Sequence, residues 1–295
     1  MDAMPAAARD RLLDLMRGCS VEVSARDPLA GEPLREIIRP GAAVYINYAP
    51  GDTHHGAVAA ATRLRKAGFD PVPHVVARYL ASFSQLNDYL VRGVGEAGIR
   101  RVLVIAGDAE RPVGPYQTSL QLLETGLFER HGIRQVDVAG YPEGHPRVSA
   151  PALDEALAAK LALAKRTGLA LSVVTQFGFE AAPIVAWLRH VRALGIDVPV
   201  RVGLAGPASI STLAKFAMRC GVGNSLRALF SGHSSVTRLL TEAGPEPVMR
   251  ALLAENGDLG IAGLHFFTFG GVKRTGAWIE EIVQGKRGVG LDDRS

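Results

Sequence analysis

Short β-branched runs alternate with longer amphipathic segments along almost the whole chain. The strand-like runs cover residues 20–24, 43–49, 72–77, 101–106, 135–139, 169–175, 199–204 and 261–267. The helical patterns between them include residues 56–66, 84–94, 119–129, 152–166, 182–194 and 209–218. Strands separated by single helices pair in parallel through right-handed crossovers, and eight such units can close on themselves. The pattern therefore predicts an α/β fold, a single (β/α)8 TIM-type barrel.

Two further features bear on this fold. An open doubly wound sheet normally carries a Gly-x-Gly-x-x-Gly turn after its first strand, and no such turn follows residues 20–24. The repeat is interrupted once, by a helical insertion over residues 224–254 before the last strand, which Pro245 and Pro247 divide into two helices. No linker-like or low-complexity stretch divides the chain, so we expect residues 1–295 to form one domain.

Composition and charge exclude several classes of protein. The 295 residues are 47% hydrophobic and 21% charged, which excludes intrinsic disorder. The 33 Lys+Arg against 29 Asp+Glu are scattered and give a net charge of +4, so we expect no nucleic-acid partner. Cys19 and Cys220 have neither a metal-ligand spacing nor a disulfide framework. The N-terminus does not resemble a signal peptide, and no apolar stretch reaches the ~18 residues of a membrane span, so we expect a cytoplasmic protein.

Polar residues lie toward the carboxyl ends of most of the predicted strands or just beyond them, where a barrel of this kind carries its active site. They are Glu22, Asn47 with Tyr48, His74, Asp108, Tyr141 to His145, Thr175 with Gln176, and His265 with Thr268. Positions 22, 47, 74, 108, 141 and 176 are 25, 27, 34, 33 and 35 residues apart, which is the length of a strand and a helix. We therefore expect these side chains to converge on one mouth of the barrel.

Four short strings occur in an order that is typical of a known family. They are Ala-Gly-Asp at 106–108, Gly-Tyr-Pro-Glu-Gly-His-Pro at 140–146, Thr-Gln-Phe-Gly-Phe at 175–179 and His-Phe-Phe-Thr at 265–268. Through them the chain resembles the methylenetetrahydrofolate reductase family, from Glu22 to Gly285. The resemblance implies an FAD-binding barrel that uses NAD(P)H to reduce 5,10-methylenetetrahydrofolate to 5-methyltetrahydrofolate, in one-carbon metabolism and methionine biosynthesis. Folate and nicotinamide are then the expected partners, with self-association into a homo-oligomer left open.

The resemblance assigns two acids to catalysis. Glu22 matches the family's catalytic glutamate, although only the Glu of the family's Glu-Phe-Phe-Pro-Pro string is present. A protonated carboxyl there can open the methylene bridge by protonating a weakly basic aryl nitrogen, and burial keeps a carboxyl protonated near neutral pH. Asp108 matches the acid of an Arg-Gly-Asp string beside the flavin and the pterin, where a carboxylate tunes the flavin potential. Ala106 replaces the Arg of that string.

The resemblance also assigns cofactor and substrate contacts. The cofactor contacts are Asn47, Tyr48, His74, Gly107, Asp108, Tyr141, His145 and Lys165, with Glu143 in the same loop as Tyr141. The substrate contacts are Gln176, whose amide suits the donor and acceptor edge of a pterin, and the aromatic rings of Phe177, Phe179 and Phe267. Phe267 and Gly271 stand where reductases carry Tyr and Arg, so the chain departs from the family beside the folate tail and the nicotinamide.

The departures from the family leave two other functions open. One is a folate-binding barrel that lacks flavin or works in reverse, oxidising methyltetrahydrofolate in one-carbon catabolism. The other is a non-catalytic partner subunit, which the retained acid at position 22 argues against. No metal site is expected, because His54 and His55 are adjacent on a helix, where neighbouring side chains point about 100° apart.

Overall fold

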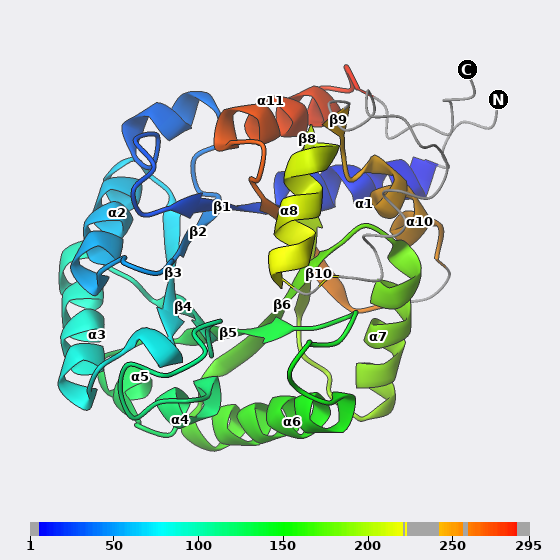
Figure 1. The fold of residues 1–295 in the computed structure, drawn as a ribbon. Coiled ribbons are helices and arrows are strands. Elements are labelled where there is room, and N and C mark those ends of the chain that lie inside the picture. Colours follow the sequence, from blue (N-terminus) through cyan, green and yellow to red (C-terminus); the bar gives the residue numbers. More distant parts are fainter. Residues whose placement is uncertain (1–5, 221, 223–241, 256–258, 288–295) are drawn as a thin grey trace. The chain divides into compact units, whose positions relative to one another are not determined.

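The computed structural model describes residues 6–220, 222, 242–255 and 259–287. Within these residues, eight strands form a closed barrel in the order β1-β10-β7-β6-β5-β4-β3-β2 (Figure 1). The strands are β1 (Ser20–Ser24), β2 (Ala43–Asn47), β3 (Asp70–Val76), β4 (Arg101–Ile105), β5 (Gln135–Gly140), β6 (Ala170–Gly178), β7 (Val200–Ala205) and β10 (Ile261–Phe267). The (β/α)8 barrel predicted from the sequence is confirmed.

Helices alternate with the strands along the chain. They are α1 (Ala6–Arg17), α2 (His54–Lys66), α3 (Phe83–Ala97), α4 (Ser119–Leu123), α5 (Leu127–Arg130), α6 (Ala150–Thr167), α7 (Ala181–Ala193), α8 (Ile210–Cys220), α10 (Glu246–Ala254) and α11 (Val272–Val283), with 3-10 turns η1 (Glu32–Glu36) and η2 (Ala77–Tyr79). A small antiparallel sheet pairs β8 (Ala208–Ser209) with β9 (Glu242–Ala243). In the described part of the chain, no helix carries an apolar run long enough to cross a bilayer.

By its internal contacts the chain divides into two compact units. The first unit comprises Val21–Gly140 and Pro151–Val174. The second unit comprises Met1–Ser20, Tyr141–Ala150 and Thr175–Ser295. That residues 1–295 behave as one domain stays a prediction.

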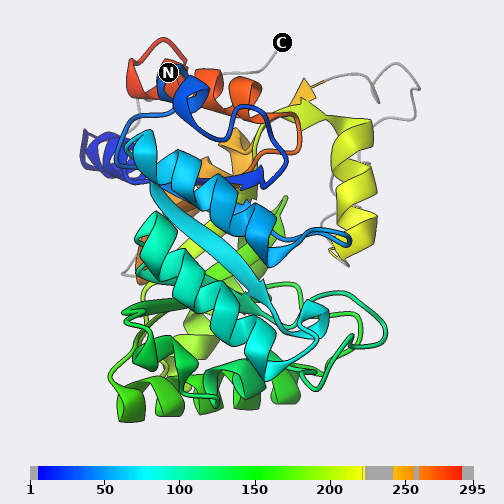
Figure 2. The same ribbon diagram turned by 90° about the vertical axis from the view of Figure 1, so that its left-hand side faces the viewer.

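In the first unit, strands β1 to β5 pair in parallel in chain order. Helix α2 begins after Thr53, whose hydroxyl accepts the Gly56 N–H at 3.1 Å, and α3 begins after Ser82, whose hydroxyl accepts the Gln85 N–H at 3.1 Å. Such caps satisfy backbone donors that a helix leaves free at its N-terminus. Figure 2 shows α2 and α3 side by side, with β3 next to them. The helix N-termini are thereby fixed beside the carboxyl ends of their strands.

A buried polar network joins β2, β4, β5 and β6 inside the first unit. Asp137 is fully buried, and its Oδ2 accepts hydrogen bonds from Tyr45 Oη at 2.6 Å and from Arg101 Nε at 2.7 Å. Ser172 donates to the other carboxylate oxygen. Arg101 is the first residue of β4, so the network lies at the amino end of that strand, opposite the end that carries catalysis in such barrels. We therefore assign this network to the scaffold.

In the second unit, β7 and β10 pair in parallel, and α11 packs on β10. The Trp278 ring of α11 meets the Phe266 ring of β10 edge-on, with centroids 5.2 Å apart. Its indole Nε1 donates to Glu246 Oε1 in α10 at 2.8 Å. These contacts fasten α10 and α11 to the last strand.

Some element boundaries differ from those predicted. The helix predicted over residues 119–129 is wrong, since Gly126 takes a left-handed conformation (φ 68°) and separates α4 from α5. Strand β6 continues three residues beyond the predicted end, to Gly178. Of the helical insertion predicted over residues 224–254, residues 224–241 lie outside the described part. Residues 242–243 form strand β9, and α10 begins after Pro245 and includes Pro247 in its first turn, so Pro247 does not separate two helices as predicted.

Candidate active site

Glu22 lies in the middle of β1, and its side chain is only 13% exposed. Asn47 Nδ2, at the end of β2, donates to Glu22 Oε1 at 3.3 Å. His74 Nε2, on β3, lies 3.5 Å from Glu22 Oε2. Three residues predicted on three separate strands are therefore brought together, because β1, β2 and β3 are neighbours in the barrel.

Of the two partners of Glu22, His74 is itself held in place. The backbone carbonyl of His74 accepts a hydrogen bond from Tyr89 Oη at 3.1 Å, and the imidazole meets the Tyr45 ring edge-on at 6.3 Å. Asn47 Oδ1 is buried, and no donor in the described part of the chain lies within hydrogen-bond distance of it. The contacts on both oxygens fix the orientation of the Glu22 carboxyl, and its low exposure limits the access of water to it.

Gly107 and Asp108 lie in the loop after β4, as predicted. Gly107 has a φ of +91°, and a Cβ on it would lie 2.5 Å from Val76 Cγ1, so only glycine fits. Tyr79 Oη donates a short hydrogen bond to Asp108 Oδ1. Arg78 fastens the same loop, because its Nη1 donates to the Ala109 carbonyl at 2.8 Å. The Asp108 carboxylate is thus exposed but oriented.

Tyr48 connects this loop to the end of β2 through aromatic contacts. Its ring stacks on Tyr79 with centroids 6.1 Å apart and lies 6.4 Å from the Tyr89 ring. Burial, together with the nearby Asp52 carboxylate, raises the pKa of the Tyr48 hydroxyl, so Tyr48 stays neutral and can donate a hydrogen bond. Tyr79 therefore links two predicted cofactor residues, Tyr48 and Asp108.

The loop after β5 is compact. The Tyr141 and His145 rings meet edge-on at 5.2 Å, and Gly144, with φ +82°, closes a turn by donating its N–H to the Tyr141 carbonyl at 3.0 Å. Burial raises the pKa of the Tyr141 hydroxyl. Glu143 Oε1 would lie 3.5 Å from a Cβ on Gly178, so the loop approaches the end of β6. Both rings are only partly exposed, which is compatible with the contact predicted for them.

Phe177, Phe179 and Phe267 belong to one aromatic cluster of the second unit, completed by Phe216 and Phe269. Phe177 is 3% exposed and contacts Phe179, Phe267 and Phe269 at 5.6, 5.5 and 4.8 Å between ring centroids. It forms the core of the cluster. Phe179, Phe216, Phe267 and Phe269 are only partly buried and pack against this core, so each keeps some exposed surface.

Gln176 lies within β6 and not beyond its end, since the strand is longer than predicted. Its Nε2 donates to the Cys220 carbonyl at the end of α8, at 3.1 Å. This hydrogen bond orients the amide. The carbonyl oxygen of the amide keeps its acceptor capacity, as a pterin contact requires.

Lys165 is exposed in the last turn of α6. Lys160 of the same helix is less exposed, and its burial lowers its pKa to about 8. A partly buried lysine with no carboxylate partner among the described residues is a further candidate contact for an anionic group. Nothing in the sequence distinguishes Lys160 from Lys165, because the difference lies in what each face of α6 covers.

The side chains of His54 and His55 lie close together, contrary to the expectation that neighbouring helical residues point too far apart to share an ion. Their rings lie 4.0 Å apart, and both Nε2 atoms approach one carboxylate oxygen of Asp88. Adjacent helical Cα–Cβ bonds diverge, but imidazoles are long enough for their rotamers to bring the ring nitrogens back together in the first turn of α2. The divergence of neighbouring side chains on a helix therefore does not exclude a metal site at His54 and His55.

Sequence comparison decides the family of this barrel. Residues 42–282 match the family model described as methylenetetrahydrofolate reductase. The chain belongs to the methylenetetrahydrofolate reductase family. The match includes every predicted site residue except Glu22, which precedes it.

Two curated proteins show the same relationship. The 5,10-methylenetetrahydrofolate reductase of Pectobacterium carotovorum is 27% identical over 209 residues, which are 69% of this chain and 66% of that protein. Methylenetetrahydrofolate reductase 2 of Saccharomyces cerevisiae is 29% identical over 148 residues, 48% of this chain and 24% of that protein. The matches thus span less than two thirds of each relative. Among solved structures, a 2,3-dimethylmalate lyase aligns over 98% of this chain and 90% of its own, at 12% identity and a TM-score of 0.49.

Sequence reasoning missed several residues that shape the site. Arg78 and Tyr79 form a one-turn 3-10 helix directly after β3, and nothing in the predicted pattern placed them against the loop after β4. Phe269 follows Phe267 at a spacing of two, and this alternation was a signal that the aromatic cluster extends beyond β10. Phe216 lies on α8, where a helical Phe gives no indication of its partner.

Proposed function

We propose that this chain reduces 5,10-methylenetetrahydrofolate to 5-methyltetrahydrofolate, with FAD as bound cofactor and NAD(P)H as electron donor. The observation that carries the proposal is Glu22, a carboxyl 13% exposed whose two oxygens are contacted by Asn47 and His74. Family membership supports this substrate class, and a carboxyl in this position would serve as the acid that the chemistry of that substrate needs.

The residues of the first unit fit a flavin ring. Asn47 Oδ1 is a buried acceptor that a ring N–H can satisfy. Gly107 holds the backbone after β4 close against Val76, where a Cβ would not fit, and so fixes the loop that carries Asp108. Tyr48, His74 and Asp108 would complete the contacts to the ring, and Lys165 of the same unit would contact the diphosphate. The contacts of Tyr141 and His145, which belong to the second unit, stay predictions from the family resemblance. Bound there, FAD would supply the chemistry of accepting hydride from the nicotinamide and giving it to the folate.

The chain's own part in the reaction is acid catalysis and orientation. Glu22 donates its proton to the aryl nitrogen of the methylene bridge, which opens the bridge to an iminium. Asn47 and His74 keep the carboxyl in one rotamer, so the proton is presented along one direction. Gln176 and the rings of Phe179 and Phe267 bind the pterin and exclude water from it.

The test is spectroscopic and kinetic. We expect the purified protein to be yellow, or to take up FAD on titration, and to oxidise NADH or NADPH when methylenetetrahydrofolate is present. Colourless protein that binds folate without FAD would identify a flavin-free folate barrel. Faster oxidation of methyltetrahydrofolate with an artificial acceptor would show that the reaction runs in reverse. Absence of flavin, folate binding and turnover together would leave a partner subunit.

Several other properties remain predictions at this stage. They are the choice between NADH and NADPH, a cytoplasmic location, the absence of a nucleic-acid partner, a role in methionine biosynthesis and self-association. Turnover with both nicotinamides and sedimentation of the purified protein address the first and the last.

A further inference from the structure

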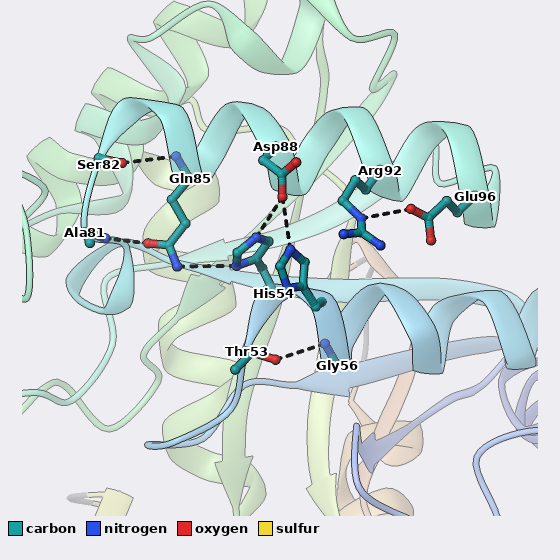
Figure 3. Close-up of polar contacts among 10 residues, drawn as sticks. Thr53, His54, Gly56, Ala81, Ser82, Gln85, Asp88, Arg92 and Glu96 are labelled. Atoms are coloured by element: carbon teal, nitrogen blue, oxygen red, sulfur yellow. Dashed lines mark hydrogen bonds and ion pairs between the residues drawn. The ribbon is translucent and has the colours of Figure 1, made fainter.

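Away from the residues proposed to act in catalysis, a cluster of side chains that could bind a metal joins α2 to α3 within the first unit (Figure 3). His54 Nε2 lies 2.8 Å from Asp88 Oδ2, and His55 Nε2 lies 3.3 Å from the same oxygen. The ligand atoms of the three residues all lie within 4.8 Å of one another. None of these residues takes part in the proposed reduction.

The backbone fixes this cluster from both sides. His54 and His55 are the first two residues of α2, directly after the Thr53 cap, and Asp88 lies in the second turn of α3. The His54 ring also packs against Tyr89, with centroids 5.9 Å apart. Exposure rises from 13% at His54 to 48% at Asp88 and 56% at His55, so the cluster is anchored at one end and open to solvent at the other.

We propose that His54, His55 and Asp88 form a binding site for a divalent transition metal, with Zn²⁺ as the best match. Two imidazole nitrogens and one carboxylate oxygen are ligands that Zn²⁺ takes at about 2.0–2.2 Å, and three protein ligands with water in the fourth position make a complete tetrahedron. Ligand atoms in such a tetrahedron are about 3.3 Å apart. The two observed contacts to Asp88 are near this spacing, so the ion enters with small movements of the side chains.

The nitrogen ligands also set the metal's class. Mg²⁺ and Ca²⁺ take oxygen ligands, and a site with two imidazoles and one carboxylate discriminates against both.

Gln85 controls the tautomer of His54 and therefore the strength of the site. Gln85 Oε1 accepts the Ala81 N–H at 2.6 Å, which leaves its Nε2 facing His54 Nδ1 at 3.3 Å. In this arrangement Nδ1 is an acceptor and the ring hydrogen is on Nε2, the atom that must bind the metal. When His54 Nε2 binds a metal, the ring hydrogen must be on Nδ1 instead. Gln85 Nε2 and His54 Nδ1 would then both be donors facing each other, which weakens metal binding.

A carboxylate at position 85 removes this conflict. In Gln85→Glu, one oxygen can still accept the Ala81 N–H, and the other accepts the Nδ1 hydrogen of a metal-bound His54. Carboxylates in this position orient ligating histidines and raise their basicity. The substitution also places an acid in the first turn of α3, which favours the helix.

The experiment is calorimetric titration of tag-free protein with ZnCl2, and with MgCl2 as the ion expected not to bind. We expect one Zn²⁺ per chain, and at least about a tenfold loss of affinity in each of His54→Ala, His55→Ala and Asp88→Asn. His190→Ala, which removes an exposed histidine of α7 outside the cluster, is the matched control and should leave the affinity unchanged. We expect Gln85→Glu to bind Zn²⁺ at least about tenfold more tightly than the unchanged chain.

Two further measurements test the proposal. Co²⁺ bound in place of Zn²⁺ should give the visible absorption typical of four-coordinate cobalt. Circular dichroism should show that each variant is folded, and we expect this because the side chains of His55 and Asp88 are about half exposed. Zn²⁺ affinity that persists in His55→Ala and Asp88→Asn would overturn the proposal, as would an unchanged Gln85→Glu. Because none of these measurements involves FAD or folate, they are independent of the proposed function.

Discussion

The chemistry of Glu22 depends on its proton, while its position depends on Asn47 and His74. Replacing it by Gln keeps the size and the hydrogen bonds but removes the proton that opens the methylene bridge. We expect Glu22→Gln to bind FAD and folate and to keep flavin reduction by nicotinamide, since hydride transfer between the rings needs no acid. Folate reduction should slow by about 10²–10⁴-fold, the usual contribution of a general acid.

Stopped-flow measurement of the two half-reactions separates these effects. The matched control is Glu32→Gln, which removes an exposed acid paired with Arg35 in the same unit and should change neither rate. If both half-reactions slow equally in Glu22→Gln, Glu22 positions the flavin and the acid is another residue.

Asp108 permits a similar separation of charge from shape. Asn at this position keeps an oxygen for the Tyr79 hydroxyl but loses the negative charge. A flavin beside a neutral group is easier to reduce, so Asp108→Asn should bind FAD, raise its reduction potential and slow the folate half-reaction. Tyr79→Phe, which keeps the charge and removes the hydrogen bond, is the control. Equal potentials in Asp108→Asn and the unchanged chain would show that Asp108 only shapes the loop.

Sequence reasoning succeeded at single residues where the backbone alone brings them together. Glu22, Asn47 and His74 lie in contact because neighbouring parallel strands place their residues side by side. The strands themselves could be predicted from the sequence. It failed where the outcome depends on rotamers or on the covered face of a helix. The convergence of His54 and His55 on Asp88 is a rotamer effect, and the burial of Lys160 in place of Lys165 depends on what packs against α6.

At the scale of elements, the loop after β4 depends on one glycine. Gly107→Ala adds both a disfavoured left-handed conformation and a Cβ 2.5 Å from Val76 Cγ1. We expect a loss of about 1–2 kcal/mol from the conformation and about 1–3 kcal/mol from overpacking, together with weaker FAD binding. Gly126→Ala is the control, because Gly126 has φ +68° and no atom within 4 Å of the added Cβ in the described chain.

Urea denaturation of both variants isolates the overpacking term as their difference. Adding Val76→Ala to Gly107→Ala should recover part of the loss, since it removes the clashing methyl group. Equal losses for Gly107→Ala and Gly126→Ala would contradict the close approach to Val76.

The partly buried side chain of Lys160 in α6 should make the free energy of unfolding depend on pH. Lys160 binds its proton in the unfolded chain at about pH 10.4 and in the folded chain at about 8. Between these values the unfolded state holds more protons, so stability rises with pH, and below pH 8 the full penalty of burying the charge is present. Lys160→Met should therefore be more stable than the unchanged chain at pH 7, by up to about 3 kcal/mol, and the gain should shrink toward pH 10.

Denaturation at pH 7 and pH 10 measures this gain. Lys165→Met changes an exposed lysine of the same helix and should show little pH-dependent difference from the unchanged chain. A pH-independent gain in Lys160→Met would mean that the lysine is solvated in the folded protein.

Element prediction succeeded where hydrophobic periodicity is strong and failed where a single backbone angle decides. The bounds of β1 and β10 agree with the predicted runs 20–24 and 261–267. The helix predicted over residues 119–129 has the right apolar spacing, yet Gly126 breaks it. The spacing of apolar residues carries no information about a left-handed glycine between two short helices.

At the scale of the whole molecule, the strand and helix pattern predicts a closed barrel, while the contacts within the chain group it into two units. A closed barrel has hydrogen-bonded strands all the way round, which favours unfolding in one cooperative step. Two units that unfold independently give two steps. Ligand binding distinguishes one-step from two-step unfolding. A ligand raises the unfolding temperature only of the part of the protein that unfolds together with the binding site.

We therefore expect a single calorimetric transition that moves as a whole when FAD is added. At a free FAD concentration of 100 times Kd, linkage supplies about 2.7 kcal/mol, which for a chain of this length corresponds to a rise in Tm of about 4 °C. AMP, which lacks the flavin ring, is the control and should give a much smaller rise. Two transitions, of which FAD moves only one, would show that the units unfold separately and that the flavin depends on one of them. An unmoved transition at saturating FAD would contradict flavin binding itself, and with it the proposed reaction.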